Sequence, residues 1–137
     1  MVKIKNSYFE LLLNKKDLIG KIKGKELTSS VSYWINKGLK TATAESENYF
    51  NEKTKLINKY AVKGPDGNVV VSGDGGVTIP NEHITELNSG LLELMDIEIE
   101  LNDLKKVDIN YEDKNMPAIS GDEQDLIEPF VNDITGK

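Results

Sequence analysis

The stretch TSSVSYWINKGLKTATAESENYFNEKTKLINKYAVK, residues 28–63, decides the fold because it predicts a single very long helix. No proline interrupts it, and Thr28, Ser29 and Ser30 are suitable N-terminal caps. Apolar or small residues recur at nearly heptad spacing, the pattern of a helix with one buried stripe. The stripe consists of Val31, Ile35, Gly38, Ala42, Tyr49, Leu56 and Tyr60, and it is widened by Trp34, Leu39, Phe50 and Ile57.

The length of this helix predicts self-association. About thirty residues at about 1.5 Å each span roughly 45 Å. We expect this to be longer than the rest of a 137-residue chain can cover. A second copy is the simplest partner for such a stripe, and Gly38, Ala42 and Ala44 would let two helices approach closely. The sequence therefore predicts a homo-oligomer through the long helix, with the aromatic residues of the stripe in a core or dimer seam.

A shorter helix is predicted before the long one. Ser7 and Glu10 have the spacing of a capping box and precede three leucines, so a helix should begin there. Gly20 is expected to end it. The lysine-rich segment GKIKGKE, residues 20–26, is then expected to be an exposed link.

The glycine-rich segment AVKGPDGNVVVSGDGGVTIP, residues 61–80, raises the question of a phosphate-binding loop. Neither of its glycine clusters is followed by Lys-Ser or Lys-Thr, which a P-loop requires. The residues 64–68, GPDGN, are instead typical of a tight turn that would join residues 60–63 to a strand at 68–72 as a hairpin. A second turn at 73–76 precedes a short apolar segment. We therefore interpret the loop as one that turns the chain.

Three elements are predicted after Pro80. Residues 81–95, NEHITELNSGLLELM, have apolar residues at helical spacing, and residues 96–101, DIEIEL, alternate as in a half-buried strand with Ile97, Ile99 and Leu101 inward. Ser120 and Glu123 form a second capping-box pattern that begins a last helix. That helix should end or kink at a proline, and the following tail should dock on the core through Phe130, Val131 and Ile134.

These elements predict the α+β class, with one long helix plus shorter helices packed on a small antiparallel sheet made of the hairpin and one added strand. The chain is expected to form a single domain, 1–137, because its length fits one core. Within it, residues 1–63 form a basic helical part, and residues 64–137 form an acidic part with the hairpin, helix, strand and final helix.

Charge divides the chain in the same way. Residues 1–63 hold thirteen lysines against six acidic residues, and residues 64–137 hold four lysines against seventeen. The overall net charge of -6 argues against general nucleic-acid binding. Two opposite halves could attract each other within or between chains, or the basic half could bind an anionic ligand. All cationic residues are lysines, so an anion site would use ammoniums, hydroxyls and backbone N–H groups.

Composition excludes several classes of protein. The chain has no cysteine, which excludes disulfide scaffolds, thiol nucleophiles and thiolate metal sites. Its early apolar run, residues 11–13, is too short for a signal core or a membrane span. We therefore expect no membrane association and no cofactor.

Two features of the sequence could carry chemistry: a row of three acidic residues and the single histidine. Asp96, Glu98 and Glu100 recur at every second residue and could hold a divalent metal for acid/base catalysis, but unpaired carboxylates on a strand are ordinarily a solvated face. His83 is the only histidine, and no nucleophile or orienting acid is patterned around it. The sequence therefore predicts that the protein is not an enzyme, with a metal-dependent enzyme as the alternative.

The order of these motifs resembles a known family. EKTKLINKYAVKGPDGN, IPNEHITELNSGLLELM, DIEIEL and ISGDEQDLIEPF together are similar to segments of small uncharacterised proteins carried by phages and prophages of low-GC Gram-positive bacteria. The resemblance covers most of the chain. It implies a phage origin and action in the host bacterial cytoplasm, and it transfers no catalytic residue.

A small phage protein without catalytic motifs is expected to act by binding. The first hypothesis is an accessory protein that antagonises host antiviral defence by stoichiometric binding of a nucleotide-derived immune signal or of a host defence protein. The alternative is a virion assembly chaperone or scaffold that grips a tail or capsid subunit. For an anionic ligand, the expected site combines hydroxyls, an aromatic face and ammoniums on about two helical turns, and it consists of Ser30, Tyr33, Trp34, Lys37 and Lys40.

Overall fold

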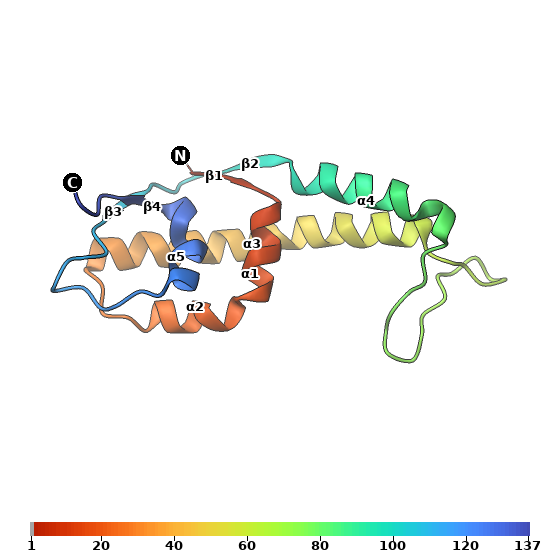
Figure 1. Cartoon of the computed structure of the whole chain (residues 1–137), viewed down its shortest axis with the longest axis horizontal. Coiled ribbons are helices and arrows are strands. Elements are labelled where there is room, and N and C mark those ends of the chain that lie inside the picture. The colour runs from red at the N-terminus through yellow and green to blue at the C-terminus, as the bar shows by residue number, and fades with distance from the viewer. Residues whose placement is uncertain (1) are drawn as a thin grey trace. The chain divides into compact units, whose positions relative to one another are not determined.

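The computed structural model describes residues 2–137, which form two compact units (Figure 1). The terminal unit runs as far as Ser46 and resumes from Glu98 to Lys137, and the central unit is Glu47–Ile97. The long helix α3 contributes to both. Along the chain, the boundaries of the units fall after Ser46 and after Ile97 and so differ from the charge boundary at residue 63. The single domain 1–137 stays a prediction.

The predicted α+β class is confirmed. The helices are α1 (Ser7–Asn14), α2 (Lys16–Lys23), α3 (Ser29–Tyr60), α4 (Asn81–Met95), α5 (Gly121–Ile127) and the 3-10 helix η1 (Glu128–Phe130). The strands are β1 (Val2–Lys5), β2 (Glu98–Leu101), β3 (Val107–Ile109) and β4 (Val131–Asp133). The long helix and the helix at 81–95 therefore form where the periodicity of apolar residues predicted them.

The composition of the sheets differs from the expected one. β2 pairs antiparallel with β1 at the N-terminus, with Val2 opposite Leu101, and β3 pairs parallel with β4. The predicted hairpin adds a strand to neither pair. One isolated antiparallel bridge, Lys63 to Val69, joins its two arms, and a second, Val71 to Val77, joins the second arm to the segment after the second turn. In the predicted strand, Leu101 is buried and Ile99 half-buried, but Ile97 precedes β2 and is exposed.

The N-terminal helix begins at Ser7 as predicted, but its N-terminal cap and its last residue differ from the prediction. Its N-cap residue is Asn6, whose side chain makes no cap hydrogen bond, so the capping box expected from Ser7 and Glu10 is not formed. The helix is interrupted at Lys15, and a second helix, α2, follows at once. Gly20 lies within α2 and does not end a helix as expected. The lysine-rich segment is therefore helical as far as residue 23, and only its end forms the link to α3.

The core of the terminal unit forms around the first part of α3. Ile35, Leu39 and Ala42 are fully buried. Gly38 lies directly beneath the ring of Phe130, and a Cβ at this position would be 2.6 Å from Phe130 Cδ1. The C-terminal tail thus docks on the core through Phe130, and also through the buried Val131 of β4.

This packing changes the argument for a homo-oligomer. Gly38 and Ala42 are covered by the same chain, so neither is free to let a second helix approach, while Ala44 remains exposed. The stripe therefore needs no second copy over this part of α3. The homo-oligomer itself stays a prediction.

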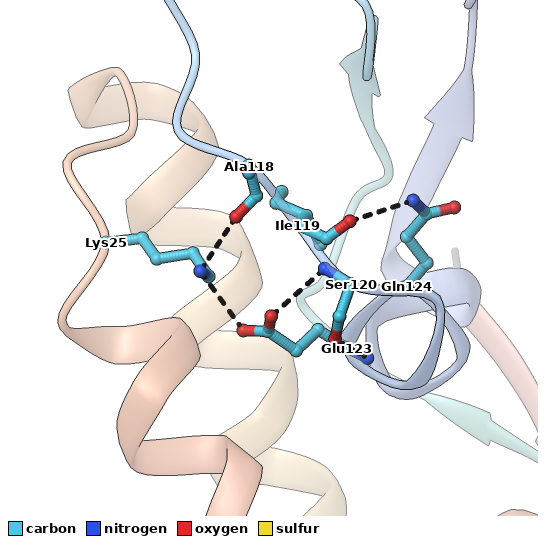
Figure 2. A network of polar contacts seen from close by, with 6 residues as sticks. All are labelled: Lys25, Ala118, Ile119, Ser120, Glu123 and Gln124. Atoms are coloured by element: carbon cyan, nitrogen blue, oxygen red, sulfur yellow. Dashed lines mark hydrogen bonds and ion pairs between the residues drawn. The ribbon is translucent and has the colours of Figure 1, made fainter.

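A polar network connects the lysine-rich link to the start of α5, as Figure 2 shows. Ser120 and Glu123 form the predicted capping box: the Ser120 hydroxyl accepts from Glu123 N at 3.2 Å, and Glu123 Oε1 accepts from Ser120 N at 3.0 Å. The other carboxylate oxygen lies 3.4 Å from the ammonium of Lys25, which also donates to the Ala118 carbonyl at 2.8 Å. Glu123 is buried, so the ion pair stabilises a charge that has lost most of its water.

Acidification is expected to destabilise the terminal unit through Glu123. Burial alone would raise the pKa of this carboxyl, but hydrogen bonds from Ser120 and the Lys25 ammonium outweigh it and hold the pKa below the ordinary 4.5. The unfolded chain therefore takes up the proton first, and this contribution to stability is present above pH 4.5 and lost as the pH falls through the folded-state pKa.

The measurement is urea unfolding followed by fluorescence of Trp34, the only tryptophan, as the pH is lowered. The wild type should lose more stability on acidification than Glu123→Gln, which keeps a capping-box side chain but has no proton to gain. Parallel curves for the two proteins would show that Glu123 is not responsible.

Candidate functional site

The glycine-rich segment in the central unit is a pair of tight turns, as predicted. Gly64 N donates to Asn68 O at 2.9 Å, and Gly67 has φ 80°, a conformation that favours glycine. Asp66 accepts hydrogen bonds from the backbone and side chain of Asn68, at 3.0 and 3.1 Å, which lower the pKa of the Asp66 carboxyl. A carboxylate of the chain thus lies where a phosphate would need free N–H groups.

The second turn is arranged in the same way. Asp74 accepts from Gly76 N at 2.9 Å and from the Ser72 hydroxyl, and these hydrogen bonds hold the pKa of Asp74 below its usual range. Both aspartates are exposed. The carboxylates of the two turns would repel a phosphate, so this segment is a poor anion site. Its structural role is to reverse the direction of the chain.

A cluster of aromatic and basic side chains lies on α3 in the terminal unit. The rings of Tyr33 and Trp34 meet edge to face, with centroids 5.1 Å apart. The Lys37 ammonium lies 5.2 Å from the centroid of Trp34 and 5.9 Å from that of Tyr33. A second ammonium, that of Lys105, lies 5.3 Å from the Trp34 centroid. We call Tyr33, Trp34, Lys37 and Lys105 the Trp34 cluster.

The structure thus brings together three of the five residues predicted for an anionic ligand. Ser30 and Lys40 are exposed on the same helix, but they are ten residues apart, about 15 Å along the axis. Lys105 was missed, because it precedes β3 in the half of the sequence that is acidic as a whole. Only the tertiary fold places it against α3.

The Trp34 cluster has the electrostatics of an anion-binding surface. Two ammoniums share one indole ring, which attracts each of them through its quadrupole. Within residues 2–137, neither Lys37 nor Lys105 forms an ion pair with a carboxylate. Tyr33 is 57% exposed, so one ring of the cluster is accessible to a partner. The cluster can therefore offer charge and a stacking face together.

The acidic residues of the alternative enzymatic hypothesis have other surroundings. Glu98 and Glu100 lie opposite Lys5 and Lys3 in the β1–β2 pair, and the Lys3 ammonium is 3.7 Å from Glu100. Asp96 lies at the C-cap of α4. Over residues 2–137, the structure gathers no three His, Cys, Asp or Glu side chains in a metal-binding group. The exposed charges of β2 thus pair across the strands as a solvated face does.

His83, the single histidine, belongs to the first turn of α4 in the central unit. Its Nε2 lies 3.5 Å from Glu82, its Nδ1 lies 3.9 Å from Glu86, and its ring is tilted on that of Tyr60 with centroids 5.5 Å apart. Nδ1 is buried without a hydrogen bond. The imidazole therefore packs as part of the helix surface, between an aromatic ring and two carboxylates.

No helix within residues 2–137 is both long and apolar enough to cross a membrane. Comparison of the chain with protein families, with curated proteins and with solved structures finds no match.

Proposed function

We propose that this chain is a phage accessory protein that antagonises host antiviral defence by stoichiometric, non-enzymatic binding of an anionic partner. The partner is a nucleotide-derived immune signal or the acidic surface of a host defence protein, met in the bacterial cytoplasm. The observation that carries the proposal is the Trp34 cluster, in which the ammoniums of Lys37 and Lys105 lie 5.2 and 5.3 Å from the centroid of the Trp34 ring.

The chemistry of the cluster supports this choice of partner. An ammonium held over an indole ring keeps donors for an anion, and the aromatic faces can stack on a base or an apolar side chain. Lysine binds phosphate or carboxylate as a point charge, so the site recognises charge without the fixed geometry of a guanidinium. Such a site sequesters a partner by affinity and needs no reacting group.

The test is native mass spectrometry of the protein mixed with extract from phage-infected, defence-expressing cells, divided by filtration into small molecules and macromolecules. The wild type is expected to gain a bound mass from one fraction. Trp34→Ala and Lys105→Ala should lose that mass, because the first removes the shared ring and the second one of its two ammoniums. The control is Lys21→Ala, which removes an exposed lysine of α2 outside the cluster.

The fraction that yields the bound mass identifies the class of partner. Binding that persists in Trp34→Ala and Lys105→Ala would show that the cluster is not the site. A wild type that gains mass from neither fraction would contradict sequestration altogether.

A further inference from the structure

The central unit, Glu47–Ile97, buries few of its apolar residues. All of its residues are described by the structure, and only Tyr49, Ala61 and Leu87 are buried. The large apolar residues that remain exposed are more numerous, and they are Val62, Val70, Val71, Ile84, Leu92 and Ile97. Small units that bury so little apolar surface normally need a partner to be stable. The unit is therefore expected to be covered by another helical surface.

One side of this unit is acidic. The second half of α3 and α4 run side by side as a helical hairpin (Figure 1). A hollow on the hairpin is bordered by Glu52 from α3 and by Glu93 from α4, so these two carboxylates mark the same side. The other carboxylates of α4 precede Glu93 by seven and eleven residues and therefore share its side of the helix; they are Glu86 and Glu82.

The opposite side of α4 is apolar. Ile84 and Leu91 are seven residues apart and so lie above one another on the helix. Glu93 comes nine residues after Ile84, about two and a half turns, which places it on the other side. Met95 continues the apolar row four residues after Leu91, and Leu92 flanks it. Ile84 and Leu92 are 40% and 66% exposed, so a partner can reach this row.

The long helix extends the apolar row across the hairpin. Phe50 and Ile57, both half-buried, are again seven residues apart. Phe50 precedes Glu52 by two residues, about half a turn, and therefore lies on the side of α3 away from the acidic hollow. We call the resulting surface the apolar face. It consists of Phe50, Ile57, Ile84, Leu91, Leu92 and Met95.

A second copy of this chain is the partner that fits the apolar face. Seven-residue spacing on both helices is the pattern of a helical bundle, and two hairpins joined face to face supply the four helices of a closed bundle. All three carboxylates of α4 lie on the other side, so a two-fold axis through this face brings none of them together. Asn88, four residues after Ile84, lies in the row, and a single asparagine in an apolar seam fixes the alignment of helices.

A lipid surface fits the apolar face less well. Helices that lie on membranes are rich in lysine or arginine on their polar face, which attracts anionic lipids. The polar side of α4 has three carboxylates, and residues 81–95 contain no lysine or arginine. An anionic lipid surface would therefore repel this helix.

We propose that the protein forms a two-fold symmetric dimer through the apolar face, with Asn88 of both copies in the seam. The length of α3 predicted self-association, and the proposal places it in the second half of this helix. In the first half, Gly38 and Ala42 are covered by the same chain. The dimer is independent of the proposed function, because the residues of the Trp34 cluster belong to the terminal unit.

The test is size-exclusion chromatography with light scattering, followed by sedimentation equilibrium, on the whole chain. The wild type should have the mass of two chains. Leu92→Glu and Ile84→Glu should each weaken dimerisation at least about a hundredfold, because a two-fold interface contains each substitution twice and buries each new charge without a partner. The matched control is Ile97→Glu. It adds the same charge at an apolar residue that is 49% exposed but lines the acidic hollow, so it should stay dimeric.

Three results would overturn this proposal: a wild type whose mass is not that of two chains, a dimer that persists in both Leu92→Glu and Ile84→Glu, and an equal loss of the dimer in Ile97→Glu. Circular dichroism distinguishes dissociation from unfolding, and Leu92→Glu should keep its helices because Leu92 is mostly exposed in the single chain. Trp34→Ala should remain dimeric, so failure of the apolar face and failure of the Trp34 cluster are separate outcomes.

Discussion

Gly38→Ala is expected to lower the free energy of unfolding of the terminal unit by about 1–3 kcal/mol, the usual effect of overpacking a core. Helix propensity alone predicts the opposite, because alanine is favoured over glycine within a helix by about 1 kcal/mol. The added Cβ would lie 2.6 to 2.9 Å from three ring atoms of Phe130, which is itself fully buried. A buried ring cannot turn out into solvent, so the ring, α3 or η1 must shift to relieve these contacts.

The matched control is Gly20→Ala. Gly20 is also within a helix, α2, but a Cβ there would meet nothing within 4 Å. This variant should be stabilised by about 0.5–1 kcal/mol, since only the propensity term remains. Urea unfolding followed by Trp34 fluorescence measures both. Equal stabilisation of the two variants would show that Phe130 does not pack on Gly38.

A second substitution localises the effect. Gly38→Ala combined with Phe130→Leu should be less destabilised than the sum of the two single variants, because the smaller side chain leaves room for the Cβ. Additive losses would place the strain elsewhere than at this contact.

The elements that were predicted correctly depend on interactions between residues that are close together in the sequence. The long helix, α4 and the capping box of α5 were predicted because their signals lie within a few residues: an apolar period, a proline before Asn81 and the pair Ser120 and Glu123. The glycine turns were predicted for the same reason. Each of these elements is specified by its own segment of the chain.

The pairing of strands was not predicted because it depends on distant segments. β1 has four residues, and its partner β2 begins only at Glu98, so no local pattern joins them. The hairpin was expected to form the sheet together with one added strand, because its turn residues, GPDGN at 64–68, are typical of a hairpin. In the structure its valines Val70 and Val71 remain exposed.

The contact of Gly38 was not predicted for the same reason, because its partner is distant in the sequence. A small residue in an apolar stripe indicates close approach, but it does not say whether the neighbour is a second chain or a distant part of the same one. The structure supplies Phe130, which comes after a predicted helix stop at Pro129. In the same way, Lys37 and Trp34 were found from their spacing on one helix, whereas Lys105 could be placed only by the fold.

Lys25→Met is expected to destabilise the terminal unit by about 2 kcal/mol. Breaking a fully buried ion pair costs roughly 3–5 kcal/mol because a charge is left without its partner. We expect a smaller loss here because the Lys25 side chain keeps 20% of its surface exposed, whereas that of Glu123 keeps 8%. The Ala118 carbonyl also loses the ammonium that donates to it at 2.8 Å. Unfolding in urea at neutral pH measures the loss.

The double variant Lys25→Met, Glu123→Gln separates the charge from the cap. Glutamine can still accept from Ser120 N, so the capping box is kept while the unpaired carboxylate is removed. The double variant should therefore be more stable than Lys25→Met alone, even though it carries one more substitution. A double variant less stable than Lys25→Met would show that the Glu123 carboxylate does not need the Lys25 ammonium. The capping box, and not the ion pair, would then stabilise this part of the structure.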